Sequence, residues 1–418
     1  MKDKPSSGKQ ILIAGGGASG MCAAVLLARA GCRVTVIEKG KACGKKLSMT
    51  GNGRCNLSNL RLDEACYFSD DNDRVRNLLE RFGAEETVSF FRSMGVPVRS
   101  EEGYLYPVSG EAKSVVNAFL FHMEKEGVSL RLNEQVKDLA KDGGVFLVRT
   151  NRETYTADAV LLSAGGLSGP KTTSSDGDGF YIAEKLGLTV AKPYPALCRL
   201  LSDDSSLPKE TGVRVTAGLL FYADNEVFAR ECGEVQLTKD ALSGIPVLQA
   251  GAACAQALDA GKQVRVVLDL YPYSTEEESD ALIAERLHAR GTESMWTFLN
   301  GFANSLINEM VLEREGINPD SAVSSYGEQT LKKVLKTYRA LDVPVRAADS
   351  FRQAQATRGG VCLKELTDYL EAEKMPGLYI TGELCNVDGR CGGYNLQWAW
   401  TSAMAAAEGI AGTPLITE

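Results

Sequence analysis

Apolar positions along the chain alternate between short runs that end in glycine and longer segments with helical spacing. The run 11–14 is followed by Gly-Gly-Gly-Ala-Ser-Gly over 15–20 and by a small-residue segment over 21–30, which predicts a buried strand, a tight turn and a helix. The run 33–38 predicts the next strand, and the run 159–163 also ends in paired glycines. Buried strands that alternate with helices in this way indicate an α/β fold of the Rossmann type.

The first turn carries the dinucleotide-binding spacing Gly15-x-Gly17-x-x-Gly20. Its first glycine permits the turn, the second lets the backbone approach a pyrophosphate, and the third lets helix and strand pack closely. The free N–H groups of Ala18 and Ser19 at the helix start then face the phosphates. Glu38 lies about 20 residues further on, where a carboxylate binds ribose hydroxyls. The alternative is a glycine-rich loop without a ligand.

Helical spacing and strand signals also indicate how the chain is divided. Segments 74–94, with a break at Gly83, and 111–125, which includes His122, read as helices. We expect a dinucleotide-binding domain from 1–192 and 346–418, and an inserted domain from 193–345. The insert is strand-rich over 193–272, with strands at 213–222, 226–231, 234–238 and 264–270. It is helical over 273–345, with helices at 276–289, which includes His288, 296–313 and 328–338. His122 is expected at the surface or in the core and His288 is expected to face solvent, so neither is expected to be catalytic.

A polar, basic loop follows the second strand, over 39–56, and we expect it to be non-helical. Lys46 and Arg54 can neutralise charge on a pyrophosphate, and the backbone over 51–54 can wrap a planar ring; solvated lysines are the alternative. Further along, Tyr104 and Tyr106 alternate to one face of a short strand. They line either a cofactor-side pocket or the edge of the core.

Glycines return at the ends of later strands. Ala164, Gly165 and Gly166 end one apolar strand, where a backbone without side chains can approach a ligand. Gly382-Glu383 ends another, and Gly392-Gly393-Tyr394-Asn395 precedes a small-residue helix over 396–408. The N–H groups at that helix start favour negative charge, as on a reduced flavin. An ordinary helix cap is the alternative.

Composition limits the function classes. The chain has 418 residues, which suggests two or three domains, and its net charge of −8 gives no electrostatic footprint for nucleic acid. Eleven cysteines without a Cys-x-x-Cys pair read as reduced thiols, and no signal peptide or membrane span is evident. We therefore expect a cytoplasmic protein without a metal site.

These motifs resemble those of the BaiN-type FAD-dependent oxidoreductases, also labelled the aminoacetone oxidase family. The resemblance runs nearly end to end and rests on these blocks: 15–20 with Glu38, Gly-Asn-Gly-Arg-Cys-Asn at 51–56, Ser-Ala-Gly-Gly at 163–166, Ser-Asp-Gly-Asp-Gly at 175–179, Thr-Arg-Gly-Gly-Val at 357–361, Gly-Glu at 382–383 and Gly-Gly-Tyr-Asn at 392–395. It implies an FAD domain built from both chain ends, with an inserted β-barrel-like lobe and a helical subdomain. Many relatives carry Thr-His where this chain has Thr238-Lys239, so no histidine chemistry is carried over.

The resemblance also implies the cofactor contacts. The predicted FAD-binding residues are Gly15, Gly17, Ala18, Ser19, Gly20, Glu38, Lys39, Lys46, Gly53, Arg54, Val136, Ala164, Gly165, Gly166, Gly382, Glu383, Gly392, Gly393 and Asn395.

Three activities follow as hypotheses. The first is NADH-dependent reduction of a C=C bond conjugated to a carbonyl, as in steroid or bile-acid dienones, with Tyr394 or Tyr106 as proton donor and Arg358 polarising the carbonyl. Only one dinucleotide fingerprint is present, so NADH would have to bind directly beside the flavin.

The second hypothesis is oxidation of a small amine by oxygen. The third, an FAD-containing tRNA-modifying protein, is disfavoured by the acidic charge balance. We expect a small-molecule substrate, steroid or CoA-linked, and neither a nucleic-acid nor a membrane partner; the oligomeric state stays open.

Overall fold

The chain forms two compact units. The computed structural model describes residues 8–208, 212–275, 277–278, 281, 284–286 and 292–415. One unit comprises Met1–Ala196 and Phe351–Glu418, and the other comprises Leu197–Ser350. These divisions fall a few residues beyond the expected 192 and 345.

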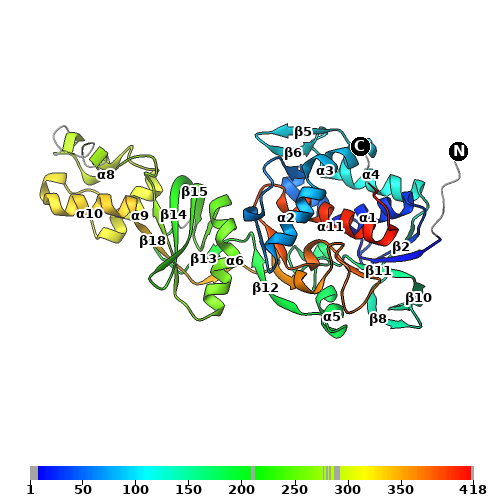
Figure 1. Cartoon of the computed structure of the whole chain (residues 1–418). Coiled ribbons are helices and arrows are strands. Elements are labelled where there is room, and N and C mark those ends of the chain that lie inside the picture. Colours follow the sequence, from blue (N-terminus) through cyan, green and yellow to red (C-terminus); the bar gives the residue numbers. More distant parts are fainter. Residues whose placement is uncertain are drawn as a thin grey trace. The chain divides into compact units, whose positions relative to one another are not determined.

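A five-stranded parallel sheet forms the centre of the first unit. Its strands lie in the order β21 (Leu378–Ile380), β11 (Ala159–Leu162), β1 (Gln10–Ala14), β2 (Arg33–Glu38) and β7 (Ser129–Leu132). Helices α1 (Ala18–Arg29) and α11 (Tyr394–Ala411) lie side by side in Figure 1, although they come from opposite ends of the chain. Both are buried almost all round because they are rich in alanine, serine and glycine. The predicted Rossmann-type α/β fold is confirmed.

Smaller elements surround this sheet. The helices are α2 (Asn72–Arg81), α3 (Ala84–Ser93), α4 (Ala112–Lys125) and α5 (Asp178–Lys185). The strands form four further sheets: β8 (Val136–Asp142), β9 (Val145–Thr150) and β10 (Thr154–Ala157); β3 (Ser58–Asn59), β6 (Tyr104–Pro107) and β5 (Val98–Glu101); β4 (Tyr67–Ser69) and β22 (Val387–Gly389); β12 (Val190–Ala196) and β20 (Ala356–Val361). The break at Gly83 is confirmed, because this residue is the N-cap of α3. The expected loop over 39–56 contains a short 3-10 helix, Leu47–Gly53, kinked by left-handed Gly51 and Asn52.

The second unit is built on a seven-stranded sheet whose neighbouring strands are all antiparallel. The order is β18 (Leu341–Val345), β17 (Val264–Asp269), β14 (Val213–Ala223), β15 (Glu226–Thr238), β16 (Ala241–Ser243), β13 (Leu200–Leu201) and β19 (Ala347–Ala348). The helices are α6 (Ile245–Asp259), α8 (Met295–Leu299), α9 (Ser305–Glu315) and α10 (Glu328–Arg339). The expectation of two strands over 226–238 is wrong, since these residues form the single strand β15, which pairs with β14 along its length with one register shift, between Phe221 and Tyr222 of β14.

The single helix expected over 296–313 is also two helices. Asn304 accepts a hydrogen bond from the backbone N–H of Leu306 and starts α9 separately. Part of the helix expected over 276–289, and His288 with it, lies outside the described residues.

His122 has a structural environment. Its ring is buried on α4, with Nδ1 3.1 Å from Arg29 Nη2 and Nε2 3.3 Å from the Met94 carbonyl oxygen. An arginine only donates and a carbonyl only accepts, so the ring is the neutral Nε2–H tautomer. Burial, and then the charge of Arg29, lower its pKa.

The eleven cysteines are all free thiols, and most are buried. Burial raises the pKa of Cys43, Cys55 and Cys198 to about 12. Within the described parts of the chain, no helix is long and apolar enough to cross a membrane.

Candidate functional site

The turn between β1 and α1 contains glycines of two kinds: Gly15 and Gly20 are packed against backbone atoms, and Gly17 faces open space. A Cβ at Gly15 would lie 2.3 Å from the Ser163 carbonyl oxygen, and one at Gly20 would lie 2.0 Å from the Gly15 carbonyl oxygen. The protein's own backbone therefore demands glycine at both positions. A Cβ at Gly17 would meet no atom of the described residues within 4 Å. The open space beside Gly17 at a helix start fits a dinucleotide phosphate, so the residues present fit this cofactor class.

Glu38 is fixed at the end of β2, beside this turn. Its Oε2 accepts a hydrogen bond of 2.9 Å from the Gly16 N–H, and its Oε1 accepts one of 2.6 Å from the Gly40 N–H. Val136 begins β8 and follows Glu134 by two residues. The Glu134 N–H donates to the Glu38 carbonyl oxygen, which brings this segment next to the end of β2. The parallel sheet thus gathers these predicted residues at the carboxyl edge of its strands.

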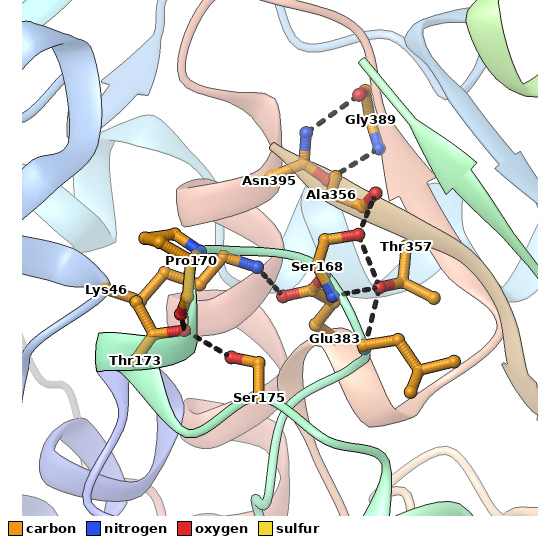
Figure 2. Close-up of polar contacts among 11 residues, drawn as sticks. Lys46, Ser168, Pro170, Thr173, Ser175, Ala356, Thr357, Glu383, Gly389 and Asn395 are labelled. Atoms are coloured by element: carbon orange, nitrogen blue, oxygen red, sulfur yellow. Dashed lines mark hydrogen bonds and ion pairs between the residues drawn. The ribbon is translucent and has the colours of Figure 1, made fainter. Parts of the chain in front are cut away.

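Two predicted cofactor-binding lysines have carboxylate partners. Lys39 Nζ forms ion pairs with Asp176 and, at 2.9 Å, with Asp178. Partial burial raises the pKa of the Asp178 carboxyl, but hydrogen bonds from Lys39 and Gln135 outweigh this effect and lower it below its usual value. Lys46 Nζ lies 2.5 Å from Glu383 Oε2, and Figure 2 shows these two side chains pointing toward one another.

Glu383 also has an unsatisfied oxygen. Its Oε1 is buried and has no hydrogen-bond partner within the described part of the chain. Nearby, a Cβ at Gly165 would meet nothing within 4 Å, whereas one at Gly166 would lie 2.5 Å from Thr357 Oγ1. A buried acceptor without a donor costs about 1–3 kcal/mol. A hydroxyl-bearing ligand in this space would satisfy it, which is a second fit to a dinucleotide.

The turn after β11 is held in place by β20. Thr357 Oγ1 accepts hydrogen bonds from the N–H groups of Leu167 (2.9 Å) and Ser168 (3.0 Å), and the Ser168 hydroxyl donates to the Ala356 carbonyl oxygen (Figure 2). Ala164 in the same turn lies against α5, since a Cβ at Gly179 would come 2.9 Å from its Cβ. The Ala164–Gly166 backbone therefore has a fixed shape.

The start of α11 is a second glycine turn. Gly393 has φ +95°, and a Cβ there would lie 2.6 Å from the Ser58 carbonyl oxygen. A Cβ at Gly392 would lie 2.8 Å from the Tyr104 ring. The Asn395 side chain pairs with both backbone groups of Gly389, at 2.9 and 2.8 Å (Figure 2). The side chain of Asn395 is therefore engaged with the protein, and the helix offers a ligand its backbone N–H groups and its dipole.

Sequence reasoning missed the residues of α11 that hold the other turns. Trp398 Nε1 donates to the Gly382 carbonyl oxygen at 3.1 Å, and Ser402 Oγ accepts from the Gly382 N–H at 2.9 Å. Trp400 Nε1 donates to the Leu57 carbonyl oxygen, and Gln397 bonds to Ser58. The available signal was a run of polar and aromatic residues in a helix otherwise made of small residues.

Arg54 and Tyr106 lie together at the surface. The Arg54 guanidinium stands 4.3 Å from the Tyr106 ring centre and 2.6 Å from Glu101 Oε2. Burial raises the pKa of Tyr106, and the neighbouring Arg54 opposes that shift. Gly53 and Cys55 are both left-handed, at φ +83° and +61°. Left-handed backbone at a residue other than glycine is strained and is common at functional sites.

The other two predicted catalytic residues are mostly buried. Tyr394 packs edge-on against Tyr67, with ring centres 5.7 Å apart, and burial together with a hydrogen bond to Cys66 raises its pKa. Arg358 forms a bidentate ion pair with Asp388, at 2.9 and 3.0 Å. The structure thus gives Arg358 a fixed charge partner.

The fold and its glycine turns define a Rossmann-type FAD-binding oxidoreductase. The chain belongs to the family described as "HI0933-like protein Rossmann domain", whose model matches residues 9–409. The resemblance to BaiN-type flavoproteins is confirmed by a relative from Clostridium scindens, named 3-dehydro-bile acid delta(4,6)-reductase. It is 34% identical over 408 residues, which cover 97% of this chain and all of the relative.

A second relative carries a different name. The ribosomal RNA dihydrouridine synthase of Escherichia coli K12 is 30% identical over 407 residues, which cover 96% of this chain and 97% of the relative. Among solved structures, the 3-ketosteroid-delta4-(5alpha)-dehydrogenase of Rhodococcus jostii RHA1 is 14% identical, with 97% of this chain and 98% of that chain covered and a TM-score of 0.49.

Proposed function

We propose that this protein is a flavin-dependent reductase of a C=C bond conjugated to a carbonyl. One observation carries the proposal: the two relatives described above are named for different substrates but for the same kind of reaction. The C4=C5 and C6=C7 double bonds of a 3-oxo-4,6-diene steroid are both conjugated to the ketone. The double bond that uridine loses on becoming dihydrouridine is likewise conjugated to a ring carbonyl.

The favoured substrate is a 3-oxo steroid or bile-acid dienone, free or CoA-linked, with NADH as the electron donor. The bile-acid reductase has the higher identity and is covered along its whole length. The net charge of −8 also disfavours an RNA substrate. Uridine in RNA is the second candidate because a full-length relative is named for it.

The mechanism assigns separate tasks to this chain's residues. Bound FAD supplies the hydride chemistry. Arg358 donates a hydrogen bond to the carbonyl oxygen, which favours the enolate character that develops during reduction. Tyr394 or Tyr106 gives a proton to the α-carbon. The raised pKa values keep both phenols protonated at neutral pH. The N–H groups at the start of α11 favour negative charge nearby.

An anaerobic experiment tests this function. The purified protein is mixed with NADH while the flavin absorbance is followed, and a steroid 4,6-dien-3-one is then added. We expect rapid bleaching by NADH and return of the colour with the dienone. Return of the colour only with a uridine-containing ribosomal RNA fragment would favour the second candidate. Bleaching by a small amine with peroxide formed in air, and none by NADH, would overturn the reductase proposal in favour of an oxidase.

Two phenylalanine variants separate the proton donors. Tyr394→Phe or Tyr106→Phe should slow recolouring by the dienone about 100-fold, because general-acid catalysis contributes roughly that much. Flavin bleaching by NADH should be unchanged in the same variant. If both variants recolour at the wild-type rate, neither tyrosine is the proton donor.

A further inference from the structure

Arg358 is held in a single orientation by two neighbours. Its Nε and Nη2 both bond to the Asp388 carboxylate, at 2.9 and 3.0 Å, so one edge of the guanidinium is fully engaged. The Phe68 ring covers one face, with its centre 3.9 Å from Arg358 Cζ. Nη1 has no hydrogen-bond partner among the described residues. The side chains of Arg358 and Asp388 are only 12% and 6% exposed.

The backbone around this ion pair is itself fixed. Asp388 lies on β22 directly opposite Phe68 on β4, so a short two-stranded sheet carries both neighbours of the arginine. The next residue, Gly389, is bonded to Asn395 in the first turn of α11. The Arg358 cation therefore lies on the same framework as the helix start that faces the cofactor.

This arrangement limits what Arg358 can bind. Asp388 neutralises the guanidinium charge and occupies the Nε–Nη2 edge, one of the two edges through which arginine binds a carboxylate or phosphate bidentately. What remains for a ligand is the two N–H groups of Nη1 and the second N–H of Nη2, and these donors belong to an electrically balanced pair. Donors on a neutralised pair suit a neutral carbonyl oxygen and disfavour an anion, which would also be repelled by the Asp388 carboxylate.

We propose that Asp388 and Phe68 are positioning residues that make Arg358 selective for a neutral conjugated carbonyl over a carboxylate. The inference rests on the proposed function and assigns the basis of its selectivity. Asp388 sets the plane of the guanidinium and removes its net charge. Phe68 keeps the guanidinium from tilting away from that plane.

The experiment measures flavin reoxidation in the FAD-loaded protein. The flavin is reduced with dithionite, cyclohex-2-enone is the probe, and benzoate is the competing planar carboxylate. In Asp388→Asn we expect reoxidation to slow by about tenfold to a hundredfold, the scale for a displaced oxyanion donor. We also expect benzoate to inhibit about tenfold more tightly than in the wild type, because Arg358 then carries an uncompensated charge. A merely structural role would not tighten benzoate binding.

Two further variants make each result decisive. Asp368→Asn removes an exposed carboxylate that lies 3.6 Å from Arg74, and it should behave as the wild type. Phe68→Leu leaves the ion pair intact and should slow reoxidation without changing benzoate affinity; it decides the question if Asp388→Asn fails to fold. If Asp388→Asn and Phe68→Leu fold and show wild-type reoxidation rates and wild-type benzoate affinities, the positioning role is overturned and the proposed function still stands. Failure of the wild type to react with cyclohex-2-enone or any steroid enone would instead overturn the proposed function.

Discussion

Two glycine turns, one before α1 and one before α11, each precede a helix start among the predicted cofactor-binding residues, but they use glycine differently. Before α1, a Cβ at Gly17 would meet nothing within 4 Å, so this side of the turn is open to a ligand. Before α11, side chains at Gly392 and Gly393 would clash with Tyr104 and Ser58. The first turn therefore needs glycine for packing and leaves space that a ligand could enter, whereas the second needs its glycines for their positive φ and for packing.

The difference shows that a glycine motif does not by itself identify ligand contacts. At the α11 turn, Asn395 is a predicted cofactor contact, but its side chain is engaged with Gly389. Substitutions in the two turns should therefore separate folding from cofactor binding, and the following variants test that separation.

The largest effect is expected for Gly20→Ala. Its Cβ would come 2.0 Å from the Gly15 carbonyl oxygen, so α1 and β1 have to move apart. Overpacking of this kind costs about 1–3 kcal/mol or more. We expect loss of soluble, FAD-containing protein, measured by yield and by thermal unfolding of the apoprotein. An apoprotein melting temperature equal to that of the wild type would contradict the close packing of Gly20 against the Gly15 carbonyl oxygen.

Gly17→Val should lower FAD affinity without unfolding the chain. The backbone at Gly17 has φ −80°, which valine tolerates, and the added side chain enters open space. We expect FAD to bind about 100-fold more weakly, which corresponds to about 2.7 kcal/mol. The measurement is titration of the apoprotein with FAD, with apoprotein melting as the control. Unchanged affinity would show that the open space is not a phosphate site.

Ser402→Ala should have a smaller effect on the α11 side. It removes the acceptor for the Gly382 N–H and costs about 1 kcal/mol. Since Glu383 follows directly, FAD affinity should fall several-fold, and Ser402→Thr should restore it. The readouts are the FAD titration and the midpoint potential of the bound flavin. A loss of stability with neither readout altered would restrict Ser402 to a structural role.

The smallest effect is expected for the pH dependence of the free energy of unfolding, through His122. This residue contacts Arg29, the last residue of α1. The pKa of His122 is lowered in the folded state, so below the ordinary histidine pKa of about 6.5 the unfolded chain binds more protons. The free energy of unfolding should therefore fall as the pH drops below that value and stay flat above it. Denaturant unfolding between about pH 5 and 8 checks this, and His122→Gln should show a weaker decline. FAD affinity should not follow this titration, because His122 contacts none of the predicted cofactor residues among its described partners.

The sequence allowed the parallel sheet, the first glycine turn and the position of Glu38 to be predicted, because each rests on local spacing. It did not reveal the partners of Lys39 and Lys46, since their carboxylates lie 137 and 337 residues away and meet them only through the fold. For the same reason, Asp388 could not be predicted as the partner of Arg358. The strand over 226–238 was divided wrongly because Gly233, at φ +149°, continues the strand although glycine usually marks a turn.

The buried cysteines have a consequence for chemical durability. A reduced flavin that meets oxygen can release peroxide, and peroxide attacks thiolates rather than thiols. Burial holds Cys43 and Cys55, both near the cofactor turns, in the protonated form far above neutral pH. Cys232, which is exposed on β15, is the thiol that an oxidant in solution reaches most easily. The protein can thus carry Cys43 and Cys55 beside the predicted cofactor turns and keep both thiols unreactive.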